Sequence, residues 1–400
     1  MNNPKQSAKT GKRIKPKKPY ADYPLYAHNT GRWAKKINGQ LHYFGPWEDP
    51  DGALNLFLHQ RDDLYAGREP TPPEGAFTMR VLANAFLNDR LHRLETGEIT
   101  QRTFDDYHRV CKMLIEHFGK NRLVEDIVPR HFNKLRAELA KGVGPVTLGN
   151  EVSRVRVIFN FAYKAGHVDA PIRFGPSFKR PSKRLLRQAR AERGLVMFEA
   201  NQIQQMLDAS SGQVRAMVWL GINCGFGNSD CAQLPQSALD LDDGWVNFPR
   251  PKTGVPRRCP LWSETVRALK DAMFHRPEAK EEEYADRVFI TKYGQPWAKD
   301  RSASPLSTEV RKILKSLKIH RQGIGFYALR HTFETIGGDC RDQVAVDYIM
   351  GHVRDDMASV YRERISDERL HAVTGTVKAW LDAAKADDHP DVIRFPSHTG

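Results

Sequence analysis

Four runs of regularly spaced apolar residues between positions 77 and 168 constrain the fold of this chain most. Within each run the apolar side chains recur every three or four residues, which places them on one face of an α-helix. Glycine, proline and threonine separate the runs and are typical of helix ends. We therefore predict a bundle of four helices whose apolar faces share one core. The runs cover residues 82–94, 100–119, 129–142 and 147–166.

The length and composition favour a folded protein of several domains. At about 150 residues per domain, 400 residues predict two or three domains. Apolar residues make up 40% and aromatic residues 10%, which excludes a largely disordered chain. No run of about 18 apolar residues occurs, so we expect no membrane span or membrane partner. The N-terminus lacks the apolar core of a secretory signal, so we expect a cytoplasmic protein. The five cysteines lack Cys-x-x-Cys spacing and are predicted to be reduced thiols, and we predict no metal site and no cofactor.

Most of the excess positive charge lies in two short segments. The chain carries 62 Lys and Arg against 48 Asp and Glu, a formal net charge of +14. Residues 1–18 contribute +7 and residues 179–193 contribute +6, so the rest of the chain is nearly balanced. A solvated tail and a solvated linker would account for both segments. Double-stranded DNA is the partner that such charge favours, and a basic connector between two folded segments suits contacts with its phosphates.

The segment before the four helices has the pattern of a small β-sheet. Two short runs rich in aromatic residues, Arg32–Ile37 and Gln40–Phe44, flank Asn38-Gly39, which is a strong signal for a tight hairpin turn. Residues 51–65 then provide the apolar face of one helix. Lys35 and Lys36 on the hairpin suit a sheet that enters the major groove of DNA, although an ordinary solvated hairpin has the same composition.

The C-terminal segment, residues 196–384, is predicted to be mainly helical with a strand pair near 245–261. It contains the ordered series Tyr327-Ala328-Leu329-Arg330-His331-Thr332, then Gly351-His352, then Tyr361 nine residues after the histidine. This series resembles the tyrosine recombinase (phage integrase) family, whose motif has a histidine, an arginine and a second histidine, followed by a Gly-His pair and a nucleophilic tyrosine. Upstream, Lys252-Thr253-Gly254 and Pro260-Leu261 resemble the lysine-bearing β-hairpin of that family.

The resemblance implies a fold that is mainly α with small β-sheets. The hairpin segment is similar to the arm-type DNA-binding domain of some family members, and the four helices are similar to the core-binding domain. The predicted parts are a basic tail (1–21), an arm-type β-hairpin domain (22–70), a helical, SAM-like core-binding domain (76–175), a basic linker (176–195), a mixed α+β catalytic domain of tyrosine recombinase type (196–384) and a tail (385–400).

The resemblance also implies a role for each residue of the series. Tyr361 would attack the phosphorus and form a 3′-phosphotyrosyl bond, which conserves the energy of the phosphodiester for later rejoining. Arg330 and His352 would donate hydrogen bonds to the phosphate oxygens, and Lys252 would protonate the leaving 5′-oxygen. Tyr327 stands where the family has a histidine, and its phenol can still donate to a phosphate oxygen.

One departure from the family pattern concerns its first catalytic arginine. The corresponding segment, Cys224 to Asp230, has Gly227 where the arginine belongs. Arg257 and Arg258, on the lysine hairpin, are the nearest candidates to replace it. A loop whose backbone N–H groups approach the phosphate is another solution. The remaining predicted DNA contacts are Lys35, Lys36, Lys179, Arg180, Lys183, Arg184 and Arg187.

Three functions remain open at this stage. The first is a site-specific recombinase that acts as a homotetramer on paired sites in double-stranded DNA, in the cytoplasm at the nucleoid. The second is a catalytically impaired DNA-binding protein that has kept the fold, which Gly227 favours. The third is a type IB topoisomerase, which uses the same tyrosine chemistry.

Overall fold

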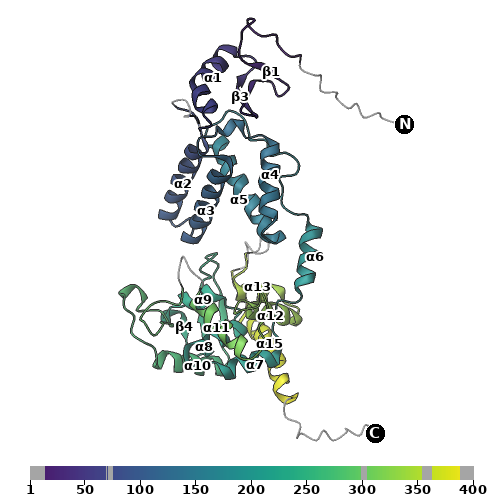
Figure 1. The fold of residues 1–400 in the computed structure, drawn as a ribbon. Helices are drawn as coiled ribbons and strands as arrows, with labels where there is room; N and C mark the ends of the chain where they lie inside the picture. Colours follow the sequence, from purple (N-terminus) through teal and green to yellow (C-terminus); the bar gives the residue numbers. More distant parts are fainter. Residues whose placement is uncertain (1–13, 69, 71–74, 299–303, 354–362, 388–400) are drawn as a thin grey trace, which may run out of the picture. The chain divides into compact units, whose positions relative to one another are not determined.

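The computed structural model describes residues 14–68, 70, 75–298, 304–353 and 363–387 (Figure 1). The chain divides into two compact units, Met1–Arg190 and Ala191–Gly400. The described elements are mainly helices with two small antiparallel sheets, so the predicted fold class is confirmed. The five cysteines are free, and four of them are buried. Within the described ranges, no helix is both long enough and apolar enough to cross a membrane.

The first unit begins with a three-stranded antiparallel sheet covered by one helix. The predicted hairpin forms, and Asn38 and Gly39 have φ of 48° and 81°, which is the backbone that a type I′ turn requires. A third strand, which the sequence pattern did not reveal because it is only three residues long, pairs with the hairpin. The side chains of Trp33, Phe44 and Phe57 join this sheet to its helix. The elements are β1 (Tyr26–His28), β2 (Arg32–Ile37), β3 (Gln40–Pro46) and α1 (Pro50–Tyr65).

The four predicted helices follow and bury their apolar faces against one another. The side chain of Thr100 accepts a hydrogen bond from the backbone N–H of Thr103, so the second helix begins after Thr100. Stacked and edge-on contacts between phenylalanine rings fill the core, which extends to Phe178, three residues past the boundary set at 175. The helices are α2 (Met79–Glu95), α3 (Gln101–Phe118), α4 (Pro129–Ala140) and α5 (Pro145–Lys164).

A half-buried histidine at the start of α4 makes the stability of this unit sensitive to acid. Nδ1 of His131 accepts a hydrogen bond from the backbone N–H of Val128 at 3.1 Å, and guanidinium nitrogens of Arg122 and Arg130 lie 3.2 and 3.3 Å from its Nε2. Burial, together with these positive charges, lowers the pKa of His131 to about 4. Between pH 6.5 and about pH 4 the unfolded chain therefore binds the proton that the folded protein excludes, and the folded state loses stability as the pH falls.

His131→Gln is expected to reduce this acid sensitivity, because the glutamine amide oxygen can still accept from the Val128 N–H and does not titrate. Thermal melts at pH 7 and pH 4.5 should show a smaller fall in Tm for the variant than for the wild type. The exposed His59 supplies the control, and His59→Gln should follow the wild type. Equal falls in Tm for all three proteins would contradict the prediction.

The basic segment after the bundle contains a helix. α6 (Lys183–Arg193) has no buried residue, so packing on a core does not hold it in place. Its basic side chains and those just before it are exposed to solvent. The segment predicted as a linker at 176–195 therefore contains the end of the bundle core and this solvent-exposed helix.

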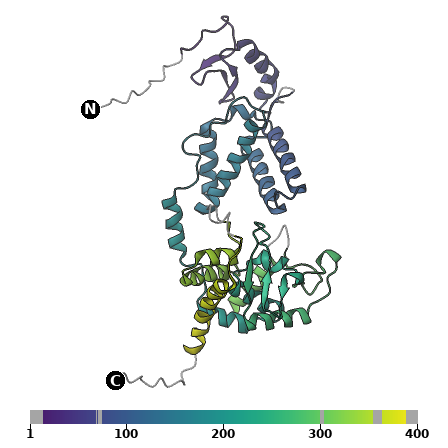
Figure 2. The same cartoon turned by 180° about the vertical axis from the view of Figure 1, so that it is seen from behind.

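The second unit surrounds α8, whose second half is completely buried. α10 and α12 pack on α8, and the C-terminal helix α15, yellow in Figures 1 and 2, packs on α7 and α12. The sheet has the order β4-β5-β6 and lies beside these helices. The helices are α7 (Ala200–Ala209), α8 (Gly212–Asn223), α9 (Asn228–Gln233), α10 (Ser263–Phe274), α11 (Pro305–Ser316), α12 (Ala328–Gly337), α13 (Gln343–Met350) and α15 (Asp367–Asp387), and the strands are β4 (Leu239–Asp240), β5 (Trp245–Asn247) and β6 (Arg258–Pro260).

Asn223, at the end of α8, is completely buried, and its side-chain amide forms hydrogen bonds to two other elements. Its amide nitrogen donates to the carbonyl of Pro260 at 3.0 Å, and its amide oxygen accepts from the backbone N–H of Trp262 and the hydroxyl of Thr265, both at 2.9 Å. These bonds join α8 to β6 and α10. They anchor the start of the loop that contains Gly225 and Gly227.

Candidate active site

Arg330, one of the predicted catalytic residues, connects two segments of the candidate site. It is in the first turn of α12 and only 2% exposed. Its two terminal nitrogens donate to the backbone carbonyls of Gly225 and Met350, each at 2.6 Å. One guanidinium therefore joins the loop after α8 to the end of α13. Burial, and then the nearby charge of Arg250, lowers the pKa of Arg330 to about 10, so the group stays protonated at neutral pH.

The loop with the missing arginine is tightly folded around two glycines. Gly225 has φ of 62°, a conformation that other residues rarely adopt. Gly227 precedes α9, and its backbone N–H donates to a carboxylate oxygen of Asp230 at 2.6 Å. The ring of Tyr327 covers Gly227 closely, since a Cβ at this position would lie 3.1 Å from Cε2 of Tyr327. The space of the missing side chain is thus partly filled by Tyr327.

Gly227→Arg is therefore expected to lower the free energy of unfolding by about 1 kcal/mol, the lower end of overpacking costs. The new Cβ would contact Asp230 and Tyr327, and Tyr327, which is 47% exposed, is the group that can move. The cost should shrink in a Tyr327→Ala background, as measured by urea unfolding in a double-mutant cycle. Gly142→Arg is the control, because a Cβ at Gly142 meets no atom within 4 Å. If the costs of Gly227→Arg and Tyr327→Ala simply add, the predicted contact is wrong.

The hairpin between β5 and β6 contacts the Gly351–His352 segment through two hydrogen bonds. Nη1 of Arg250 and the hydroxyl of Thr253 both donate to the carbonyl of Gly351, at 3.3 Å each. Lys252 lies between these two residues and is exposed. The contacts hold the turn that carries Lys252 against the segment that carries His352. The sequence did not lead us to predict Arg250 as a site residue. Its position two residues before Lys252, on the same hairpin, is the signal that could have identified it.

The structure separates the two arginines that were predicted to replace the missing one. Arg257 is 4% exposed, donates to Asp230 at 2.8 Å and to the carbonyl of Phe248 at 2.7 Å, and has its guanidinium carbon 4.2 Å from the ring centre of Phe226. Burial lowers the pKa of Arg257, and Asp230 opposes that shift. Arg257 thus lies beside the Gly227 loop.

Arg258 points to the other face of the strand, as neighbours on a β-strand do. Its guanidinium carbon lies 3.8 Å from the ring centre of Trp245, and its Nη1 donates to Asp367 at 2.9 Å. Arg258 therefore connects β6 to α15. Among the described residues, the Arg258 guanidinium thus contacts Trp245 and Asp367 and not the Gly227 loop.

His352 lies next to two carboxylates. Gly351 ends α13 with φ of 63°, and Nδ1 of the following His352 lies 3.2 Å from Asp347 and 3.7 Å from Glu334. Among the described residues, these three form the one group of His, Cys, Asp or Glu with potential ligand atoms within 4.8 Å of one another. A hydrogen bond between the imidazole and the Asp347 carboxylate accounts for the group. Such a bond orients the ring and leaves Nε2 free to donate.

The other predicted residues lie in separate places. Tyr327 makes an edge-on contact with His331, with ring centres 5.4 Å apart. Tyr361 lies outside the described residues. Nζ of Lys35 lies 4.8 Å from the ring centre of Phe57, on the face of the sheet that α1 covers, whereas Lys36 is exposed on the opposite face. The remaining predicted DNA contacts are all exposed, and they are Lys179, Arg180, Lys183, Arg184 and Arg187.

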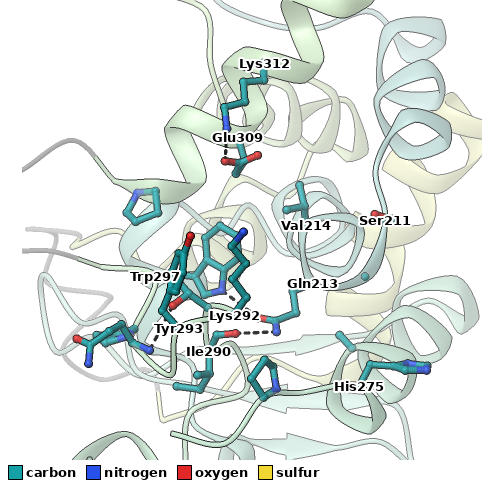
Figure 3. Close-up of a pocket in the computed structure, with 17 residues that line it drawn as sticks. Ser211, Gln213, Val214, His275, Ile290, Lys292, Tyr293, Trp297, Glu309 and Lys312 are labelled. Atoms are coloured by element: carbon teal, nitrogen blue, oxygen red, sulfur yellow. Dashed lines mark hydrogen bonds and ion pairs between the residues drawn. The ribbon is translucent and has the colours of Figure 1, made fainter. Parts of the chain in front are cut away.

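A cavity of about 800 Å³ lies elsewhere in the second unit (Figure 3). Trp297 donates to the side chain of Gln213 at 2.9 Å, and Gln213 donates to the carbonyl of Ile290 at 2.8 Å. Lys312 pairs with Glu309 across its rim at 2.7 Å. None of the predicted catalytic residues that the structure describes lines this cavity, and the polar groups named above are paired with one another.

Comparison with known proteins defines the class. The fold of the chain matches a Tn1549 transposon integrase fragment in complex with a circular intermediate DNA, with a TM-score of 0.56, 17% identity, and coverage of 74% of this chain and 98% of that one. It also matches a lambda integrase dimer bound to a COC′ core site, with a TM-score of 0.55, 18% identity, and coverage of 86% and 96%. A lambda integrase tetramer bound to a Holliday junction gives a TM-score of 0.54 at 17% identity, with coverage of 87% and 98%.

The second unit has the fold of the tyrosine recombinase catalytic domain. Its residues 197–367 match the sequence model of the phage integrase family. No protein of curated function shows significant sequence similarity to the chain.

Proposed function

We propose that this protein is a site-specific DNA recombinase that cuts and rejoins DNA through a 3′-phosphotyrosyl intermediate. The observation that carries the proposal is the position of Arg330. Its buried guanidinium bonds the loop after α8 and the end of α13, beside the segment that carries His352 and the hairpin that carries Lys252. These contacts between the segments that carry Arg330, His352 and Lys252 support the proposal.

The reaction begins when the phenol oxygen of Tyr361 attacks the phosphorus of one strand. The bond from phosphorus to the 5′-oxygen breaks, and Lys252 donates a proton to that oxygen as it leaves. The 5′-hydroxyl of a partner strand later attacks the phosphotyrosyl bond and restores Tyr361. The number of phosphate bonds is unchanged, so the chemistry consumes no external energy.

The cationic groups stabilise the charge that builds on the non-bridging oxygens in the transition state. Arg330 is held in place by two backbone carbonyls before DNA arrives, so little reorganisation is needed when the phosphate binds. Asp347 accepts from Nδ1 of His352 and directs Nε2 toward the phosphate.

The exposed basic residues at the end of the bundle and on α6 provide affinity for the DNA backbone. Binding of Lys and Arg to phosphates releases counterions, so the affinity should fall steeply as salt increases. Lys36 offers a further contact from the open face of the N-terminal sheet. Recombination between two sites requires four active sites, and we propose a homotetramer on paired DNA sites, acting at the nucleoid in the cytoplasm.

A second candidate function is that of a catalytically impaired DNA-binding protein. Gly227 favours this candidate, because loss of one phosphate-binding donor commonly lowers a rate by about 10²–10³. A Gly227→Arg/Tyr327→Ala variant that cleaves far faster than the wild type would support it. A type IB topoisomerase is distinguished by relaxation of supercoiled plasmid without strand exchange.

The test of the proposal is a nicked suicide substrate built from the DNA that flanks the gene, where inverted half-sites would identify the target. On such DNA the wild type should form a covalent adduct that survives denaturing electrophoresis. Mass spectrometry of the digested adduct should locate the nucleotide on Tyr361. If DNA is bound but no adduct forms on either strand, the recombinase proposal is wrong and the second candidate replaces it.

A further inference from the structure

Arg250 lies directly beside Arg330, although the two residues are far apart in the sequence. Arg330 donates to the carbonyl of Met350, and Arg250 donates to the carbonyl of Gly351, the next residue. Consecutive Cα atoms are about 3.8 Å apart, so the two guanidinium groups are bound to neighbouring peptide units. The hairpin thus places a second arginine at the site.

The absence of a side chain at Gly351 leaves room for the side chain of Arg250. A Cβ at Gly351 would lie 2.9 Å from Cβ and 3.1 Å from Cδ of Arg250. The φ of 63° at this position also favours glycine. The close approach fixes the stem of Arg250 against the segment that leads into His352.

Among the residues that the structure describes, no carboxylate pairs with Arg250. Among the described residues, its one side-chain hydrogen bond goes to the Gly351 carbonyl, which carries no charge. Asp230, the acid near Arg330, is already bound by Arg257 and by the Gly227 N–H. Two neighbouring like charges without an acid between them repel each other, and a bound anion removes that repulsion.

Arg257 is less suited to contact DNA. Its guanidinium is enclosed by Phe226 and Phe248, and two of its three nitrogens already donate to protein groups. The third, Nη1, is buried without a partner. Arg257 therefore holds Asp230 and the Gly227 loop. Arg250 is half-buried, and within the described part of the chain only its Nη1 donates to a protein group, so its other N–H groups can serve a ligand.

We propose that Arg250 binds the scissile phosphate together with Arg330 and so replaces the arginine that is missing at position 227. This assignment rests on the proposed recombinase function. Each guanidinium contacts a non-bridging oxygen, and neither takes part in proton transfer; the covalent step remains the attack of Tyr361 with Lys252 as the acid. Because Arg250 on the hairpin then supplies the positive charge, position 227 needs no arginine and can be glycine. The ring of Tyr327 occupies part of the space that an arginine side chain would fill.

The test compares cleavage of two suicide substrates in single-turnover experiments. One carries the normal phosphodiester at the scissile position, and the other carries a methylphosphonate, in which a neutral methyl group replaces one charged oxygen. Arg250→Ala should slow cleavage of the phosphodiester by about 10²–10³-fold. On the methylphosphonate the loss should be less than about tenfold, because little charge builds up for the arginine to stabilise.

Two further variants make the result specific. Arg258→Ala removes an arginine from the same hairpin that turns toward Trp245 and Asp367, and it should slow both substrates equally and only slightly. Arg250→Lys keeps the charge without the planar fork and should lie between the wild type and Arg250→Ala on the phosphodiester. If Arg250→Ala does not fold, as judged by its thermal melt, Arg250→Lys carries the same comparison.

The outcomes separate the two proposals. A wild type that forms no adduct with either substrate overturns the proposed function, and the assignment of Arg250 with it. A wild type that forms an adduct while the Arg250 variants cleave normally overturns the assignment alone. Equal slowing of both substrates by the Arg250 variants also overturns it, because a purely structural role does not depend on the charge of the phosphate.

Discussion

Tyr361→Phe should abolish covalent adduct formation completely while leaving DNA binding unchanged. The substitution removes the phenol oxygen, which is the atom that would bond to phosphorus, and keeps the ring. The measurement is adduct yield on the nicked suicide substrate, with affinity for the same DNA measured by fluorescence anisotropy.

A neighbouring tyrosine provides the control for this prediction. Tyr348 lies on α13, thirteen residues before Tyr361, and its burial raises its pKa. Tyr348→Phe should form the adduct as the wild type does. An adduct that persists in Tyr361→Phe, or that disappears in Tyr348→Phe, would assign the nucleophile to a different residue.

Arg330→Ala should impair both catalysis and folding. The cleavage rate should fall by at least about 10²–10³-fold, because a fixed cation at the phosphate is lost. The free energy of unfolding should also fall by about 1–3 kcal/mol, since the carbonyls of Gly225 and Met350 become buried acceptors without a donor. Loss of this one guanidinium is therefore expected to lower both the cleavage rate and the free energy of unfolding.

The two effects of Arg330 can be measured separately. Single-turnover cleavage reports on the phosphate contact, and urea unfolding reports on the two backbone hydrogen bonds. Arg330→Lys keeps the charge but cannot reach both carbonyls in the geometry of the guanidinium fork, so it should recover part of the rate and little of the stability. Arg311→Ala, at an exposed position on α11, should change neither property. Wild-type stability in Arg330→Ala would show that the two hydrogen bonds contribute nothing.

The helices and the hairpin could be predicted because their signals are local. Apolar spacing of three and four residues reports directly on one helix face, and α2 to α5 begin and end close to the predicted positions. Asn38-Gly39 specifies its turn because both residues accept positive φ. β1 escaped prediction because its pairing with β2, rather than its own three residues, makes it a strand.

The neighbours of the candidate site could be predicted only in part. The series from Tyr327 to His352 pointed to Arg330, and the structure joins Arg330 to the Gly225 loop through a hydrogen bond that no local pattern encodes. Phe178 joins the bundle core from beyond the predicted boundary, because its ring packs on Phe132 of α4, far earlier in the chain, as well as on the nearby Phe174.

The sequence by itself determined which chemical groups this protein has: a basic linker, an ordered series of tyrosine, arginine and histidine residues, and a glycine at position 227. Only the tertiary structure decided which arginines accompany Arg330. Arg257 and Arg258 are adjacent and identical in type, yet the pleat of β6 sends one toward Asp230 and the other toward Asp367. Arg250 reaches the site because its hairpin folds onto Gly351, a contact between residues 101 positions apart. Side-chain direction and long-range contact depend on the packed backbone, and these contacts bring Arg250 beside Arg330.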